Sequence, residues 1–130
     1  MHLGLYREMP GWDVIYALEF EPEYEALAES VQDELVAHLI VLEQNGPQLG
    51  RPLVDTLAGS KHANMKELRF SIGKETWRFA FAFDSKGQAV VLAGGDKTGQ
   101  DQKRFYKRLI KVADDRFSAH LVRLKEGDGT

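Results

Sequence analysis

Arg78 lies within residues 76–84, where side chains alternate in character as they do along a β-strand. One face would carry four large apolar side chains: Trp77, Phe79, Phe81 and Phe83. Arg78 falls on the other face, where the positions that follow it, Ala80 and Ala82, are small and leave room above the sheet. A guanidinium there could bind phosphate, because it stays ionised and offers two parallel donors. The alternative is an ordinary ion pair with Asp84 or with a carboxylate on a helix.

The preceding strand, expected over 66–72, carries two further cations. Arg69 shares its predicted face with Glu67 and Ser71, and projects to the same side as Arg78 if the aromatic face is buried. Strict alternation puts Lys66 on the opposite face. Lys66 remains a candidate because it starts the strand, where the register is loose.

Lys97 lies in the polar, glycine-rich segment 94–99, which we expect to be a loop after a central strand at 89–93. Backbone amides in such a loop could form an anion-binding nest, although a plain turn is the alternative. The segment lacks the Gly-x-x-x-x-Gly-Lys-Ser/Thr pattern of a phosphate-binding loop.

Tyr106 lies in the first turns of the last predicted helix, between Lys103 and Lys107. It could stack on a base or share a proton with a phosphate, or it could simply pack in the core beside Phe105. His62, in a loop, could carry protons near neutral pH or could be merely solvated.

These residue types favour one class of chemistry. Arg, Lys, His and Tyr can cleave RNA without a metal: the 2′-hydroxyl attacks the adjacent phosphate, cations stabilise the developing charge, and a weak base and acid move protons. The chain has no cysteine, which excludes disulfides, thiolate zinc sites and a thiol nucleophile. Its four histidines have no recognised ligand spacing, so we expect no metal.

Several elements must position these side chains. We expect a strand over 12–20, a helix or bent helical hairpin over 22–44, a loop over 45–60, strands over 66–72, 76–84 and 89–93, and a helix from about 100 with a possible break near Asp114. This order predicts a single α+β domain over 1–130: a small, mostly antiparallel sheet, made of an N-terminal strand and a three-strand meander, with helices packed on one face.

Charge is divided unevenly along the chain. Residues 1–59 hold 2 Lys/Arg and 11 Asp/Glu, whereas residues 60–112 hold 12 and 5, although the whole chain has a formal charge of only −3. A basic half with interleaved aromatics is typical of surfaces that bind nucleic acid, and also of a solvated face. No apolar run is long enough to span a bilayer, and no signal-peptide pattern begins the chain, so we expect a cytoplasmic protein without membrane contact.

Several segments, taken in order, resemble the RelE/HigB-type toxins of type II toxin–antitoxin systems, most closely their phage-derived HigB-like branch. They are residues 55–60, the Leu-Arg pair that ends 64–69, the Trp-Arg-Phe-Ala-Phe-Ala-Phe-Asp run of 77–84, Gly-Gly-Asp-Lys at 94–97, and Phe-Tyr at 105–106. The resemblance covers about residues 12–120.

This resemblance implies a RelE-like fold and a metal-independent endoribonuclease (mRNA interferase) that cleaves mRNA, usually at the ribosome, without a cofactor. It also implies a cognate antitoxin, often a helix-turn-helix protein. The implied catalytic residues are Arg69, Arg78, Lys97 and Tyr106, and the implied RNA-binding residues are His62, Lys66, Lys103 and Lys107. Two alternatives stay open, because a fold alone does not fix a function: a toxin acting on another target such as DNA gyrase, and a non-catalytic co-repressor that only binds its antitoxin.

Overall fold

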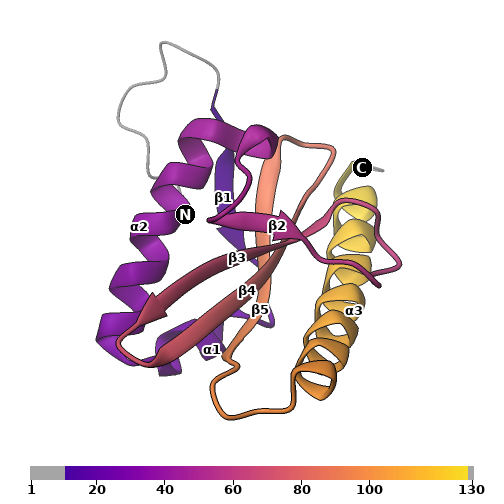
Figure 1. The fold of residues 1–130 in the computed structure, drawn as a ribbon. Helices are drawn as coiled ribbons and strands as arrows, with labels where there is room; N and C mark the ends of the chain where they lie inside the picture. Colours follow the sequence, from indigo (N-terminus) through magenta and orange to yellow (C-terminus); the bar gives the residue numbers. More distant parts are fainter. Residues whose placement is uncertain (1–10, 129–130) are drawn as a thin grey trace.

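The computed structural model describes residues 11–128. Its elements along the chain are β1 (Asp13–Tyr16), α1 (Glu21–Ala26), α2 (Glu29–Asn45), the short 3₁₀ helix η1 (Gly46–Gln48), β2 (Val54–Thr56), β3 (Met65–Ile72), β4 (Glu75–Phe83), β5 (Gln88–Asp96) and α3 (Gln102–Asp128). The strands of the described residues form one sheet in the order β1-β5-β4-β3-β2 (Figure 1). The predicted α+β class and the mostly antiparallel sheet are confirmed.

The meander of β3, β4 and β5 forms as predicted, with antiparallel pairing throughout. β1 is shorter than the strand expected over 12–20 and pairs in parallel with β5, with Val14 opposite Ala89. Phe20, expected at the end of that strand, instead follows a turn closed by its backbone N–H to the Ala17 carbonyl, and its ring enters the core. β2 lies within the segment expected to be a loop. Three residues are too few to show an alternating pattern.

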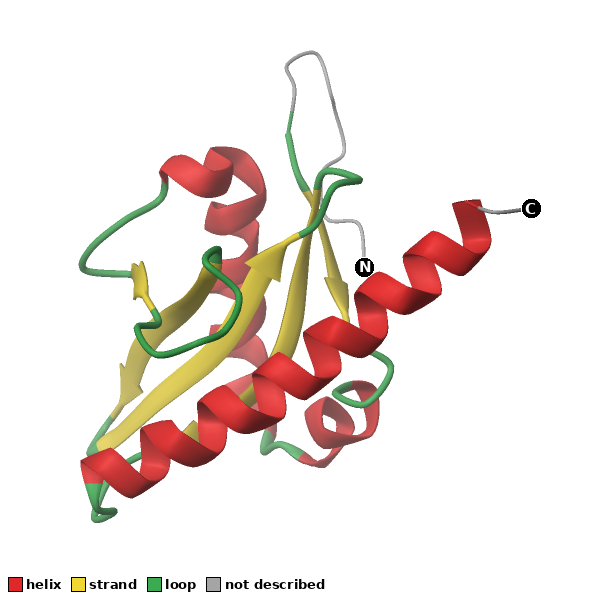
Figure 2. Ribbon diagram, turned by 90° about the vertical axis from the view of Figure 1, so that its right-hand side faces the viewer, coloured by secondary structure: helices red, strands yellow, loops and turns green. Residues whose placement is uncertain are grey.

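The helices cover both faces of the sheet, which corrects the expectation of one covered face (Figure 2). Phe70 of β3 stacks on His38 of α2. Glu67, three residues earlier on the same strand, accepts a hydrogen bond from Tyr106 of α3 on the opposite face. The face of Ala80 and Ala82 had suggested an uncovered surface. Both alanines are fully buried, because small side chains let a helix approach the sheet closely.

The helical segments follow the predicted periodicity. Residues 22–44 form the bent hairpin, α1 and α2, separated by extended backbone at Leu27 and Ala28. α2 buries Val31, Leu35, Leu39 and Leu42. α3 continues without the possible break at Asp114. That carboxylate instead accepts hydrogen bonds from the Ser60 hydroxyl and the Lys61 backbone N–H, and so fixes the loop before β3 to the helix.

β5 continues through the glycines that we had expected in a loop, and ends at Asp96. A Cβ added at Gly94 would come within 2.2 Å of the Phe79 ring, and one at Gly95 would come within 3.2 Å of Phe105. The two glycines therefore allow aromatic rings to lie directly on the strand from both sides. Within residues 11–128, no helix has the length and apolar character to cross a membrane.

Replacing Gly94 with alanine should lower the free energy of unfolding by about 1–3 kcal/mol, because the new Cβ overlaps the Phe79 ring in the core. Chemical denaturation followed by circular dichroism measures the change. Gly50→Ala is the matched control, since nothing lies within 4 Å of its added Cβ. Equal unfolding midpoints for the two variants would contradict the packing described here.

Candidate functional site

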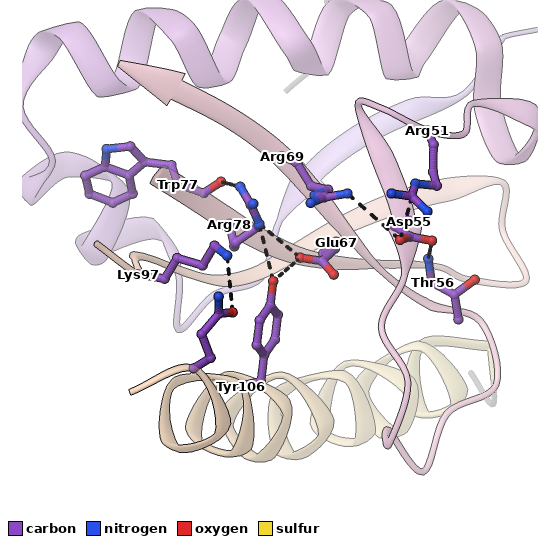
Figure 3. A network of polar contacts seen from close by, with 10 residues as sticks. Arg51, Asp55, Thr56, Glu67, Arg69, Trp77, Arg78, Lys97 and Tyr106 are labelled. Atoms are coloured by element: carbon purple, nitrogen blue, oxygen red, sulfur yellow. Dashed lines mark hydrogen bonds and ion pairs between the residues drawn. The ribbon is translucent and has the colours of Figure 1, made fainter. Parts of the chain in front are cut away.

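Five polar side chains from four parts of the chain meet between the sheet and α3 (Figure 3). Glu67 and Arg69 come from β3, Arg78 from β4, Lys97 from the turn after β5, and Tyr106 from α3. The strand register places Arg69 directly opposite Arg78, so both project from the same face of the sheet as predicted. We call these five residues the basic cluster.

Arg78 is at the centre of the basic cluster and is only 6% exposed. Its Nε donates to the Tyr106 hydroxyl at 3.3 Å and lies 3.3 Å from Oε1 of Glu67. One terminal nitrogen, Nη1, donates to the Trp77 carbonyl at 2.9 Å, whereas Nη2 makes no hydrogen bond to the described residues. The guanidinium is thus held firmly along one edge and keeps a donor group for another acceptor.

Glu67 is the residue that sequence reasoning left without a role. It is 7% exposed and is the carboxylate that pairs with Arg78, in place of the suggested Asp84. Asp84 instead lies 2.9 Å from the ring of His120 and accepts hydrogen bonds from Gln88. The sequence did offer one signal for Glu67: it is an acidic residue on the same predicted face of the sheet as Arg69 and Arg78.

Tyr106 closes the network from the helix side. Its hydroxyl donates to Oε1 of Glu67 at 2.8 Å. Burial and this hydrogen bond to Glu67 raise the pKa of Tyr106, against the opposing effect of Arg78. The phenol therefore stays protonated at neutral pH. The core-packing alternative holds in part, because the half-buried ring also makes an edge contact with Phe105.

Arg69 has an unsatisfied donor. Its Nη1 lies 3.9 Å from the Asp55 carboxylate of β2, which also faces Arg51 at 3.8 Å. Its Nε is buried and has no hydrogen-bond partner. A buried donor without an acceptor is costly. The Arg69 side chain as a whole is 27% exposed, so its guanidinium can still meet an acceptor such as a phosphate oxygen.

Lys97 approaches the basic cluster from the turn after β5. Its Nζ donates to Gln102 at 3.2 Å. Burial lowers the pKa of Lys97, and the positive charges of Arg78 and Arg69 lower it further, with Glu67 acting in the opposite direction. Of the two alternatives for this segment, the plain turn fits the hydrogen bonds better, because the backbone N–H groups of Lys97 and Thr98 already donate to the Thr76 carbonyl and the Asp96 carboxylate.

The other predicted residues lie outside the basic cluster. Lys66 stands opposite Phe81 in the register, on the α2 side of the sheet. His62 lies 3.1 Å from the Ser118 hydroxyl, and Ser118 is about 18 Å along α3 from Tyr106 at 1.5 Å per residue. Lys103 and Lys107 are exposed on α3. Among the described residues, no three His, Asp or Glu side chains gather closely enough to hold a metal ion.

The basic cluster thus joins three cations to one carboxylate and one protonated phenol in a partly desolvated setting. Cations at such a site can bind an anion such as a phosphodiester and stabilise charge that develops on it, because attraction strengthens where water is excluded. The carboxylate can accept a proton, and the phenol or the ammonium can donate one.

Comparison with known proteins shows the family to which this chain is related. Residues 22–118 match the model described as "Phage derived protein Gp49-like (DUF891)". The chain is 50% identical over 95 residues to the putative toxin HigB2 of Mycobacterium tuberculosis, a match that covers 72% of this chain and 47% of HigB2, so it spans about half the length of that relative. It is 41% identical over 103 residues to the putative toxin HigB3 of the same organism, covering 79% of this chain and 88% of HigB3.

Among solved structures, the fold is similar to a mutant of the E. coli toxin RelE in the free state. The TM-score is 0.56 at 11% sequence identity, and the match covers 78% of this chain and 95% of RelE. At that identity the likeness concerns the fold alone. The family match, the two relatives and the shared fold together confirm the predicted resemblance: the chain belongs to the Gp49-like family of HigB/RelE-type toxins.

Proposed function

We propose that this toxin cleaves messenger RNA at the basic cluster, without a metal ion and in association with the ribosome. The observation that carries the proposal is the guanidinium of Arg78, fixed by Glu67 and Tyr106 beside Arg69 and Lys97. The names of the relatives, putative toxins, support the biological class. A cognate antitoxin is the expected protein partner.

Each residue of the basic cluster has a role in the proposed reaction. The 2′-oxygen of RNA attacks the adjacent phosphorus, the O2′–P bond forms and the P–O5′ bond breaks. Glu67 takes the proton of the 2′-hydroxyl, and Lys97 gives one to the departing 5′-oxygen. Arg78, through Nη2, and Arg69, through the exposed part of its guanidinium, bind the phosphate oxygens on which negative charge grows. Tyr106 holds Glu67 and Arg78 in place.

The exposed Lys103 and Lys107 would bind the RNA backbone on the way into the basic cluster. Lys66 and His62 would contact RNA only beyond the basic cluster, because they lie on another face and near another part of α3. Their assignment remains a prediction with less geometric support.

A non-catalytic role is the second candidate, and one observation favours it. Arg78 is buried and already paired with a carboxylate of its own chain, as in a purely structural ion pair. A co-repressor that only binds its antitoxin would need Arg78 for this structural ion pair and for no catalytic step. Action on DNA gyrase is a further alternative within the same fold, and a supercoiling assay with purified protein distinguishes it.

Arg78→Ala should reduce mRNA cleavage by about 100- to 1,000-fold, the usual cost of losing one donor to a developing oxyanion. Primer extension on transcripts after induced expression measures the cleavage. Lys74→Ala, at an exposed turn, is the control and should cleave normally. Growth arrest by the unaltered protein with intact transcripts, or equal cleavage by Arg78→Ala, would contradict the proposal.

Glu67→Gln should lower kcat by about 100-fold or more with a smaller change in KM, because the amide keeps the shape of the side chain but cannot accept the proton. Single-turnover cleavage of a short RNA separates kcat from KM. Tyr106→Phe is the paired variant, which loses only the positioning hydroxyl and should cleave faster than Glu67→Gln. If Tyr106→Phe cleaved more slowly than Glu67→Gln, Glu67 would not be the base.

The pH dependence of cleavage tests Lys97. Its lowered pKa means that Lys97 loses its proton at a lower pH than an ordinary lysine does, so cleavage should decline on the alkaline side below the usual lysine range. Lys97→Arg should remove this decline and also lower the rate at neutral pH, because arginine keeps the positive charge but hardly gives up its proton. A pH–rate profile with the same alkaline limb in both proteins would show that another group is the acid.

A further inference from the structure

The outward side of α3 carries four cations outside the basic cluster, of which only Lys107 has been given a role in RNA binding. Arg104, Lys107, Arg108 and Lys111 are exposed and recur at helical spacing, so they form one continuous strip, which we call the basic ridge. In the described part of the chain, only Lys111 among them has an ion-pair partner, Asp115 at 3.1 Å. The other three make no ion pair with the described residues, although the Asp101 carboxylate lies close to Arg104, where it accepts a hydrogen bond from the Arg104 backbone N–H.

The basic ridge surrounds an apolar hollow. Its four side chains and Val112 line a hollow of about 280 Å³. A second hollow, of about 290 Å³, adjoins it between α3 and β5 and shares Arg108 and Val112. Its lining adds the apolar residues Phe105 and Leu109. Cations at the rim of an apolar surface suit a ligand that carries both carboxylates and apolar side chains.

The second hollow also touches an unpaired strand edge. β1 pairs with β5 only as far as Val91, and Gly94 farther along β5 is exposed on the lining of this hollow. On either side of Gly94, the Leu92 and Asp96 carbonyls are already bonded, to Arg116 and Gln100. An unpaired strand edge offers backbone hydrogen bonds to an extended chain segment.

The basic ridge faces away from the basic cluster. Tyr106 points from α3 toward Glu67 and Arg78 on the sheet, whereas the four ridge residues project to solvent. Of the acidic helices, α2 lies across the sheet, whereas α1 lies beside α3 (Figure 2). Glu23 of α1 lines the second hollow, where it is already paired with Arg116 of α3. An RNA strand that enters the basic cluster past Lys103 and Lys107 would touch only this edge of the basic ridge, and its phosphate backbone has no apolar group to fill the hollows.

We propose that the basic ridge and its two hollows bind an acidic segment of a partner protein that carries an apolar side chain. The proposal rests on the proposed function in its choice of partner, because the segment expected to bind there belongs to the cognate antitoxin. Carboxylates of the segment pair with Arg104, Lys107 and Arg108. Its apolar side chain enters the hollow at Val112, and its backbone can reach the edge of β5 at Gly94.

The test measures binding of the antitoxin encoded beside this protein, by calorimetry, to full-length charge-reversal variants. The triple variant Arg104→Glu, Lys107→Glu, Arg108→Glu should weaken binding by about 100-fold or more at low salt. The matched control, Lys61→Glu, Lys74→Glu, Lys125→Glu, reverses the same number of exposed charges and should change affinity by less than about 5-fold. Val112→Asp should also weaken binding, because it places a carboxylate in the apolar hollow.

RNA cleavage by the same variants, without the antitoxin, keeps this proposal separate from the proposed function. Loss of antitoxin affinity specific to the ridge triple variant supports the docking surface even if no variant cleaves RNA. Equal affinity of the ridge triple variant and the control would overturn it. It would also be overturned if the ridge triple variant lost binding to RNA while antitoxin affinity stayed unchanged, or if sedimentation showed that the ridge instead binds a second copy of this chain.

Discussion

The structure depends on how one buried carboxylate is satisfied. Glu67 is almost enclosed by protein, and a charge in that position is tolerated only with close, hydrogen-bonded partners. Arg78 and Tyr106 supply them at 3.3 and 2.8 Å. Because the three residues come from β3, β4 and α3, satisfying Glu67 fixes the last helix against the sheet at the point where the other cations gather. Removal of any one partner would leave a buried charge or donor unpaired.

Small residues on the sheet make this contact possible. Ala80, Ala82 and Gly95 form the surface on which α3 rests, and Phe105 of α3 lies directly over Gly95. Larger side chains there would push the helix outward and carry the Tyr106 hydroxyl away from Glu67. The same packing excludes water from one side of the basic cluster, which strengthens its electrostatic interactions and lowers the pKa of Lys97.

The local patterns predicted much of the sheet. Alternation along 66–72 and 76–84 correctly placed Arg69 and Arg78 on one face, and the 3.6-residue period of 22–44 gave the helical hairpin. Their roles in cleavage remain a prediction. The predictions that failed concern features that are set by contacts between residues far apart in the sequence. The burial of the Ala80 face depends on where α3 returns, and the three-residue β2 exists only because β3 offers it an edge. Likewise, the extension of β5 through Gly94 depends on the Phe79 ring that covers it.

Site prediction was limited by the same cause. Residue type identified the cations, but Glu67 gains its importance from Tyr106, which is 39 residues distant in sequence. His62 has suitable chemistry, yet the loop that holds it is fixed by Asp114 near the middle of α3, far from Arg78. A short sequence motif does not show how far apart its residues lie in the folded chain. Charge asymmetry pointed to a basic surface, and the structure divides that surface into the basic cluster and the basic ridge.

The most direct measurement of the central claim is a crystal structure of the protein with a short RNA whose 2′-hydroxyls are methylated, so that attack on phosphorus cannot occur. The account predicts a phosphate within hydrogen-bond distance of Arg78 and Arg69, with Glu67 facing the blocked 2′-oxygen. RNA bound elsewhere, with the Arg78–Glu67–Tyr106 network unchanged and no phosphate beside it, would contradict the account.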